Sequence, residues 1–187
     1  MTKYMWKFLN QKGNTIVSKN GDLKWKVGEW QHVDGKIVLC ENGLHASNTI
    51  YDAFSYVQGS VLAKVEVKGK HKDEDDKSAY SDMRIIEAYK WTKKDSVSLA
   101  IFSAELCLKE FEKLYPNDNR PRKAIDAARA VLAHDTAKNR SAAELAARSA
   151  RSARSAAWSA AWAAVWSAAI KEIDTWFNKR VKELEKI

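Results

Sequence analysis

Cysteine and proline are scarce in this chain of 187 residues, which contains two of each. Cys40 and Cys107 are too few for a disulfide framework, so we expect a protein of a reducing compartment. The chain also lacks the C-x-x-C and H-x₃-H pairs that structural zinc sites use. We therefore predict neither a metal ion nor another cofactor.

Long apolar runs are missing as well. The opening residues, MTKYMWKFLN, contain no run of the kind that a signal peptide requires. No stretch of about 18 strongly apolar residues exists, because Ser and Arg interrupt the Ala-rich segment. We expect a cytoplasmic protein without a membrane partner.

Tryptophan and positive charge, in contrast, are abundant. The chain has eight tryptophans, and 32 Lys and Arg residues against 24 Asp and Glu residues give it a formal net charge of +8. A positive balance favours anionic partners such as nucleotides, nucleic acid or acidic proteins. We do not expect general nucleic-acid binding, because acidic residues are interspersed throughout and no recognised reading motif is present.

The first half, residues 1–92, has the composition of a β-rich domain. Residues 61–67 alternate apolar and polar side chains, which predicts a half-buried strand. A short helix is expected over residues 49–58, with Ser47 or Asn48 as its cap. Tight hairpin turns with positive φ are predicted at three pairs: Asn20-Gly21, Asp34-Gly35 and Asn42-Gly43. The run from His71 to Ser78, HKDEDDKS, is expected to be a solvated loop; its carboxylates lack the spacing of a calcium loop.

The second half, residues 93–187, favours helix almost throughout. We expect one helix capped by Asp95 or Ser96 and a second that begins near Pro121. A third should begin near Ser141, where S-A-A-E matches a capping box. The predicted fold class is therefore α+β: an antiparallel β-rich domain with a short helix, followed by a bundle of three or more helices. No flexible linker separates the halves, so we expect them to pack together.

One long helix is expected from Arg140 to Ile170, RSAAELAARSARSARSAAWSAAWAAVWSAAI. At about 100° per residue, its Arg residues and the Trp residues that follow share one stripe. Guanidinium groups can bind phosphates and indole rings can stack on bases. Alternatively, Trp at four-residue spacing fills the core of a bundle or a self-association interface. We favour a mixed case, in which the Arg end binds an anion and the Ala/Trp end is buried or joins a homo-oligomer.

A second basic group lies at the predicted start of the helix near Pro121. Free backbone N–H groups at a helix N-terminus favour anions, although a capped and solvated helix start is an equal alternative. The predicted ligand-binding residues of both regions are Arg120, Arg122, Lys123, Arg140, Arg148, Arg151, Arg154, Trp158 and Trp162.

The segment LCENGLHAS places Cys40 and His45 five residues apart. A thiol and an imidazole could form a nucleophile–base pair, but no third group that would orient the base is identifiable. A histidine beside a glycine turn more often satisfies a backbone carbonyl. We therefore predict no catalytic residue, and leave an enzyme acting through Cys40 or His45 as an alternative.

Several blocks in order, KWKVGEW, CENGLHAS, DAFSYVQGSVLAKVEV and DKSAYSDMRII, resemble an uncharacterised domain family common in bacteriophage genomes, over residues 4–92. The resemblance implies structural roles for its recurring positions: Gly28, Cys40, Gly43, Leu44, His45, Gly59 and Lys77. PRKAIDAARAVLAHDTAKNRSAAELAARSARSA is similar to an Ala-rich helical immunity-protein family of bacterial toxin systems. The tryptophans depart from that family's pattern.

These resemblances imply a role in phage–host or bacterial conflict, in the cytoplasm of a bacterial host. The first hypothesis is a non-enzymatic counter-defence protein that sequesters an anionic nucleotide immune signal. The second is a protein that inhibits a bacterial toxin or defence effector by binding to it. The third is an enzyme that processes a nucleotide.

Overall fold

The structure is a computed structural model that describes residues 3–19, 23–156 and 161–187, with the backbone alone in residues 150–156 and 161–167. Its contacts divide the chain into two units. Unit 1 comprises residues 1–91 together with 174–187, and unit 2 comprises residues 92–173.

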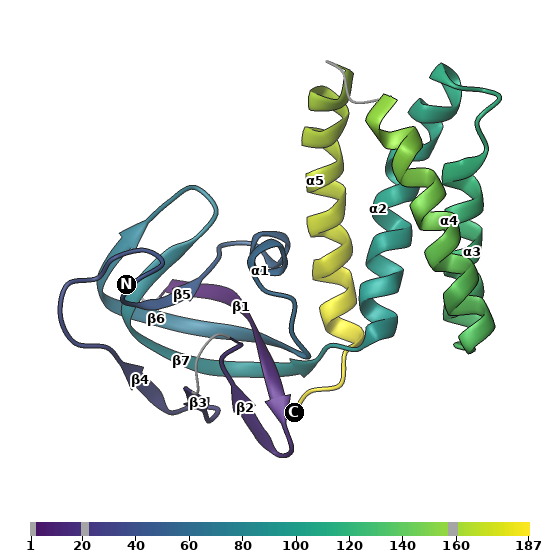
Figure 1. The fold of residues 1–187 in the computed structure, drawn as a ribbon. Helices are drawn as coiled ribbons and strands as arrows, with labels where there is room; N and C mark the ends of the chain where they lie inside the picture. Colours follow the sequence, from purple (N-terminus) through teal and green to yellow (C-terminus); the bar gives the residue numbers. More distant parts are fainter. Residues whose placement is uncertain (1–2, 20–22, 157–160) are drawn as a thin grey trace. The chain divides into compact units, whose positions relative to one another are not determined.

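Unit 1 is built on an antiparallel sheet (Figure 1). The strand order is β3-β2-β1-β6-β7-β4, and β5 pairs with β7 as well. The two longest strands, β6 and β7, form a hairpin at its centre, and β1 lies along the other side of β6. The strands are β1 (Lys3–Lys12), β2 (Thr15–Val17), β3 (Lys24–Trp25), β4 (Trp30–His32), β5 (Leu44–Ala46), β6 (Val61–Asp73) and β7 (Ser78–Lys90).

One face of this sheet carries the main apolar core. The odd-numbered residues 61, 63, 65 and 67 of β6 are all buried. This alternation confirms the strand predicted over residues 61–67. Met5 and Leu9 of β1 lie opposite Val65 and Val61 in the register and join the same cluster. Because successive strand residues point to opposite faces, this pattern orients the whole sheet.

The other face of β1 supports an aromatic cluster. The helix α1 (Ile50–Tyr56) contacts β1 and supplies Phe54, whose ring centroid lies 5.3 Å from that of Phe8. Phe177, near the end of α5 (Ala161–Arg180), is 1% exposed, and its ring lies 5.6 Å from Trp91. Residues 174–187 are therefore part of the packing of unit 1.

The last residues of the chain also pair with the sheet. The Lys90 N–H donates to the Glu185 carbonyl, and the Ile187 N–H donates to the Ala88 carbonyl, each at 2.9 Å. A 3₁₀ turn at Val181–Glu183 connects α5 to this segment. The C-terminal segment thus adds backbone hydrogen bonds to the end of β7.

Unit 2 is helical. It contains α2 (Lys93–Leu114), α3 (Arg120–Ala133), α4 (Ala137–Ala156) and the first part of α5. The middle helix, α3, contacts both α2 and α4. An antiparallel sheet followed by several helices confirms the predicted α+β class. The packing of the two halves against each other stays a prediction.

The helix starts differ from the predicted ones. Thr92 caps α2 in an extended conformation, and Asp95 sits in the first turn as the reciprocal partner of a capping box. Thr49, and not Ser47 or Asn48, caps α1. The helix predicted to begin near Ser141 begins at Ala137, where the Thr136 hydroxyl accepts the Asn139 N–H at 3.1 Å. In each case a threonine side chain accepts a backbone N–H at the observed start; it lies upstream of the predicted residues in α2 and α4, and just after them in α1.

Three other predictions are refined. The single helix expected over residues 140–170 corresponds to two helices, α4 and α5, and residues 157–160 between them lie outside the described residues. The loop expected over residues 71–78 is shorter, because the β6–β7 hairpin continues to Asp73 and Ser78. Gly35 and Gly43 have the predicted positive φ, at 91° and 146°. The Asn20-Gly21 turn lies outside the described residues.

Phe177→Ala should destabilise unit 1 by about 3–5 kcal/mol, since it removes a buried ring from the aromatic cluster. Urea unfolding followed by circular dichroism measures this loss. Leu114→Ala is the matched control: Leu114 is an exposed residue of α2, so its truncation should change the unfolding free energy by at most about 0.5 kcal/mol. Equal effects of the two changes would contradict the assignment of residues 174–187 to the core of unit 1.

Candidate functional site

The predicted anion site at the start of α3 is occupied by a carboxylate of the chain itself. Asp118 Oδ1 accepts the Arg120 backbone N–H at 3.1 Å, and its two oxygens accept Nε and Nη2 of Arg120 at 2.8 and 2.6 Å. The Arg120 guanidinium lowers the pKa of Asp118, so this carboxylate stays charged. Asp118 therefore takes the place that an external anion would have at this helix end.

The next arginines of α3 hold the helix against α2. Arg122 Nε and Nη2 donate to the two carboxylate oxygens of Glu112, each at 2.7 Å. Arg129 donates to Glu105 at 2.5 Å and to Asp126 at 3.1 Å. The forked pair between Arg122 and Glu112 fixes orientation as well as charge. Lys123, also predicted as a ligand residue, is exposed.

The basic residues of α4 are less well balanced. The helix contains five basic residues and one acidic residue. Arg140 pairs with Asp135 at 2.9 Å, whereas Arg148 is exposed and no carboxylate of the described residues pairs with it. Arg151 and Arg154 follow at three-residue intervals in the same helix, but their side chains, like those of Trp158 and Trp162, lie outside the described residues.

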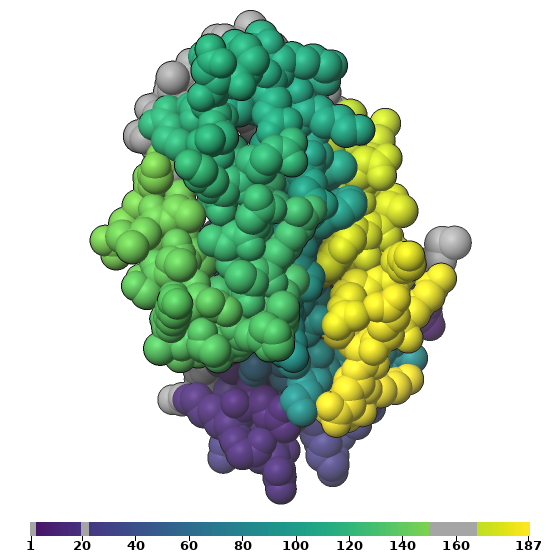
Figure 2. All heavy atoms as spheres, turned by 90° about the vertical axis from the view of Figure 1, so that its right-hand side faces the viewer, coloured from purple at the N-terminus to yellow at the C-terminus, as the bar shows by residue number. Residues whose placement is uncertain are grey.

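The packing of α4 leaves this charge at the surface. Asn139, Ala143 and Ala146 are half-buried at the spacing of one helix face, and α4 contacts α3. On the remaining surface, Leu145 is 64% exposed, and Arg148 follows it by three residues. In Figure 2, α4 (light green) forms part of the unit 2 surface beside α3. The helix thus presents both cationic and apolar groups to solvent.

Cys40 and His45 lie close together but do not form a nucleophile–base pair. His45 Nε2 accepts the backbone N–H of Cys40 at 2.9 Å, so the imidazole is engaged with the main chain rather than with the thiol. Burial lowers the pKa of His45, and the nearby Lys7 adds to this effect. A neutral ring suits an acceptor, and its partner is a backbone N–H rather than the backbone carbonyl that we expected.

Two lysines missing from the predicted ligand set surround this pair. Lys7 lies on β1 between the core residues Met5 and Leu9, and its Nζ donates to the His45 carbonyl at 2.6 Å. Burial lowers the pKa of Lys7 to about 8. Lys77 Nζ lies 3.6 Å from Cys40 Sγ. The sequence does contain a signal for Lys7: it stands between Met5 and Leu9 at the two-residue spacing of the buried face of β1.

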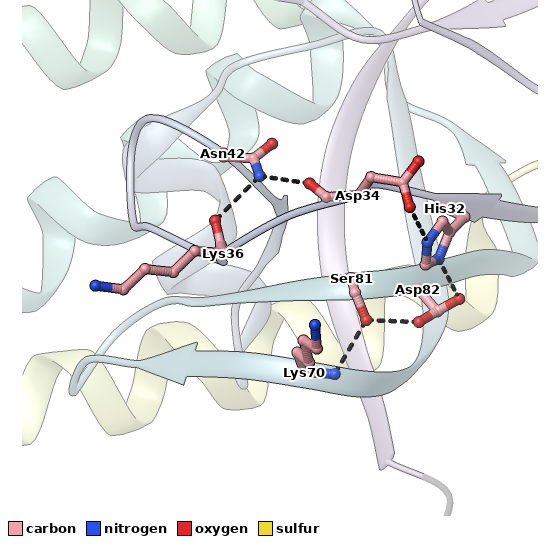
Figure 3. Close-up of polar contacts among 7 residues, drawn as sticks. All are labelled: His32, Asp34, Lys36, Asn42, Lys70, Ser81 and Asp82. Carbon is pink, nitrogen blue, oxygen red and sulfur yellow. Dashed lines mark hydrogen bonds and ion pairs between the residues drawn. The ribbon is translucent and has the colours of Figure 1, made fainter.

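A third polar cluster joins the loop after β4 to β7 (Figure 3). His32 Nδ1 lies 2.8 Å from Asp82 Oδ1, and His32 Nε2 lies 3.2 Å from Asp34 Oδ1. Ser81 Oγ donates to Asp82 at 2.6 Å. Asn42 Nδ2 donates to the Asp34 carbonyl at 2.8 Å, which closes the loop. The hydrogen bond to Asp82 is the main cause of a raised His32 pKa.

The described residues contain no group of three or more His, Cys, Asp or Glu side chains placed to hold a metal ion. Within the same part of the chain, no helix combines the length and apolar character that crossing a membrane requires. The α4 sequence combines five basic residues with one acidic residue, and its Arg148 is exposed.

Comparison with known proteins gives one match, which lies in the N-terminal part of the chain. Residues 5–94 match the family described as Domain of unknown function (DUF7666). Neither the curated proteins nor the solved structures gave a match. The matched segment contains Cys40, His45 and Lys77, and its description assigns no activity to them. The bacteriophage association and the resemblance of the helical half to an immunity protein stay predictions.

His32→Asn should make unit 1 less stable mainly at acidic pH. Since the folded-state pKa of His32 is raised above its ordinary value of 6.5, its contribution is fully present below pH 6.5 and is lost as the pH rises through the folded-state value. Thermal unfolding of wild type and variant between pH 5 and 9 measures the difference. The exposed His134 of unit 2 provides the control change, His134→Asn. A His32→Asn deficit that grew with pH would be inconsistent with the Asp82 ion pair.

Proposed function

We propose that this protein sequesters an anionic nucleotide signal of bacterial antiviral defence without transforming it, and that α4 supplies the binding surface. The observation that carries the proposal is the contrast between two neighbouring helices. Arg120, Arg122 and Arg129 of α3 are each matched by carboxylates, whereas α4 has five basic residues, one acidic residue and the exposed Arg148.

Positive charges without nearby carboxylates repel one another and destabilise a helix, and a bound anion offsets this repulsion. Like charges within three or four residues on a helix repel, and an approaching phosphate reverses that effect. Arg148, Arg151 and Arg154 repeat at intervals of three residues within α4. Guanidinium groups at this spacing are suited to the several oxygens of a nucleotide phosphate.

Binding rather than catalysis is supported by the Cys40 and His45 geometry. The imidazole nitrogen that would act as a base accepts the Cys40 backbone N–H. A general base must reach the proton that it removes, and this ring is already engaged with the main chain. The defence setting itself rests on the resemblances of the two halves, and a homo-oligomer formed through the Ala/Trp-rich segment belongs to the same proposal.

A second candidate is a protein that binds and inhibits a toxin or defence effector. The specific observation in its favour is Leu145, which is 64% exposed and lies three residues before Arg148. Arginine is enriched in protein interfaces, and an exposed apolar side chain beside it adds area that a partner would bury. Under this alternative, Leu145→Ser would abolish co-purification of a protein partner, whereas nucleotide binding would require no Leu145 contact.

Mass spectrometry of small molecules released by heat tests the main proposal directly. The purified protein is first exposed to an extract of defence-activated bacterial cells and then washed. Release of an intact nucleotide supports sequestration. Release of a chemically altered nucleotide supports the enzyme alternative, and recovery of a protein without any nucleotide supports the inhibitor alternative.

Arg148→Glu should weaken nucleotide binding by at least about tenfold, because it reverses a charge in the proposed site. Thermal shift against a panel of mononucleotides and cyclic dinucleotides provides the measurement. A ligand at about 100 times its Kd stabilises the folded state by about 2.7 kcal/mol, which is easily detected.

Lys109→Glu is the matched control for that change. Lys109 is an exposed residue of α2, so the substitution alters the net charge equally and leaves α4 intact. If both variants lost affinity to the same extent, the binding would depend on overall charge and the assignment to α4 would be wrong.

A further inference from the structure

Two reactive side chains from separate turns of unit 1 meet at its surface. Cys40 lies in the turn closed by backbone hydrogen bonds between Val38 and Asn42, at 2.8 and 2.9 Å. Lys77 lies in the turn between β6 and β7, 37 residues further along the chain. Lys77 Nζ and Cys40 Sγ are 3.6 Å apart. The tertiary structure therefore places an ammonium group directly beside a thiol.

The position of the ammonium group is well defined. Lys77 Nζ pairs with Glu74 at 3.1 Å and lies 4.8 Å from the centre of the Tyr56 ring. The Tyr56 hydroxyl donates in turn to Asp76 at 2.5 Å. The Lys77 side chain is 17% exposed, and the hydrogen bond to Glu74 is the main cause of its raised pKa. Lys77 thus remains a cation that cannot easily leave the thiol.

The thiol itself is open to solvent. Cys40 is exposed, and its backbone has a φ of 63°, with the N–H held by His45. Cys107 provides a contrast within the same chain: it is half-buried in α2, and burial raises the pKa of its thiol. A cation beside an accessible sulfur favours thiolate chemistry, whereas apolar burial disfavours it.

We propose that Cys40 is an oxidative modification site that hydrogen peroxide converts to a sulfenic acid, and that Lys77 is its positioning residue. The Cys40 thiolate attacks one peroxide oxygen, so the S–O bond forms as the O–O bond breaks. Sulfur is oxidised by two electrons and the peroxide is reduced. The departing hydroxide takes up the proton that the thiol released when the thiolate formed, and the products are Cys40–SOH and water.

This inference is independent of nucleotide binding, because it concerns unit 1 alone and uses no residue of α4. Sulfenic acid is reversible: a low-molecular-weight thiol converts it to a mixed disulfide and then to the free thiol. The site would accordingly respond to peroxide without permanent damage. The charge attraction between Lys77 and Cys40 gives the reaction its selectivity for one of the two cysteines.

The test uses the full chain, hydrogen peroxide and dimedone, a 1,3-dione that traps sulfenic acids. Peptide mass spectrometry then gives the labelling rates of Cys40 and Cys107 separately. We expect Cys40 to be labelled at least about tenfold faster than Cys107, since thiolate character and exposure govern this chemistry. Lys77→Met should reduce the Cys40 rate several-fold, and Lys77→Arg, which keeps the charge, should restore most of it.

Equal labelling of the two cysteines in the wild type would overturn the proposal. An unchanged Cys40 rate in Lys77→Met, with folding verified by circular dichroism, would do the same. If Lys77→Met does not fold, the salt dependence of the labelling rates in the wild type provides the test. The rate ratio of Cys40 to Cys107 should fall as ionic strength rises, because salt screens the attraction between the Lys77 ammonium and the solvent-exposed Cys40 sulfur. A constant ratio would refute the role of Lys77.

Discussion

The return of the C-terminal segment to the sheet is the contact on which unit 1 depends. Phe177 is buried among Phe54 and Trp91, and the last residues add backbone hydrogen bonds to β7. The matched domain covers residues 5–94, so part of its packing comes from residues far outside that segment. Burial of a large aromatic ring removes apolar surface from water, and this gain stabilises the pairing of distant segments.

Arginine has two different uses in unit 2. In α3, Arg122 and Arg129 form ion pairs with α2, and the forked pair between Arg122 and Glu112 fixes one helix on the other. In α4, Arg148 is left at the surface beside the exposed Leu145. Composition counts these residues equally. The partners of each arginine separate those that join two helices from Arg148, which stays exposed.

Cys40 and His45 also separate into two roles, although the sequence places them in one motif. His45 supports the turn by accepting the Cys40 N–H, whereas the Cys40 sulfur faces Lys77 from the β6–β7 turn. The residues that matter to the thiol are thus distant in the chain. His45, the neighbour of Cys40 in the sequence, contacts the Cys40 backbone. The side chain that lies beside the Cys40 sulfur belongs to Lys77, which sequence proximity does not indicate.

Local patterns in the sequence were sufficient to predict the α+β class, the strand over residues 61–67 and the helix that begins near Pro121. The reason is that polar–apolar alternation and helix N-terminal preferences each involve only a few neighbouring residues. The caps of α1 and α2 differ from the predicted ones, since a neighbouring threonine competes for the same N–H groups. Ion pairs such as Arg122 with Glu112 and the approach of Lys77 to Cys40 were decided by the tertiary structure alone. They join residues 10 and 37 positions apart, and charge or composition carries no information about which long side chains will meet.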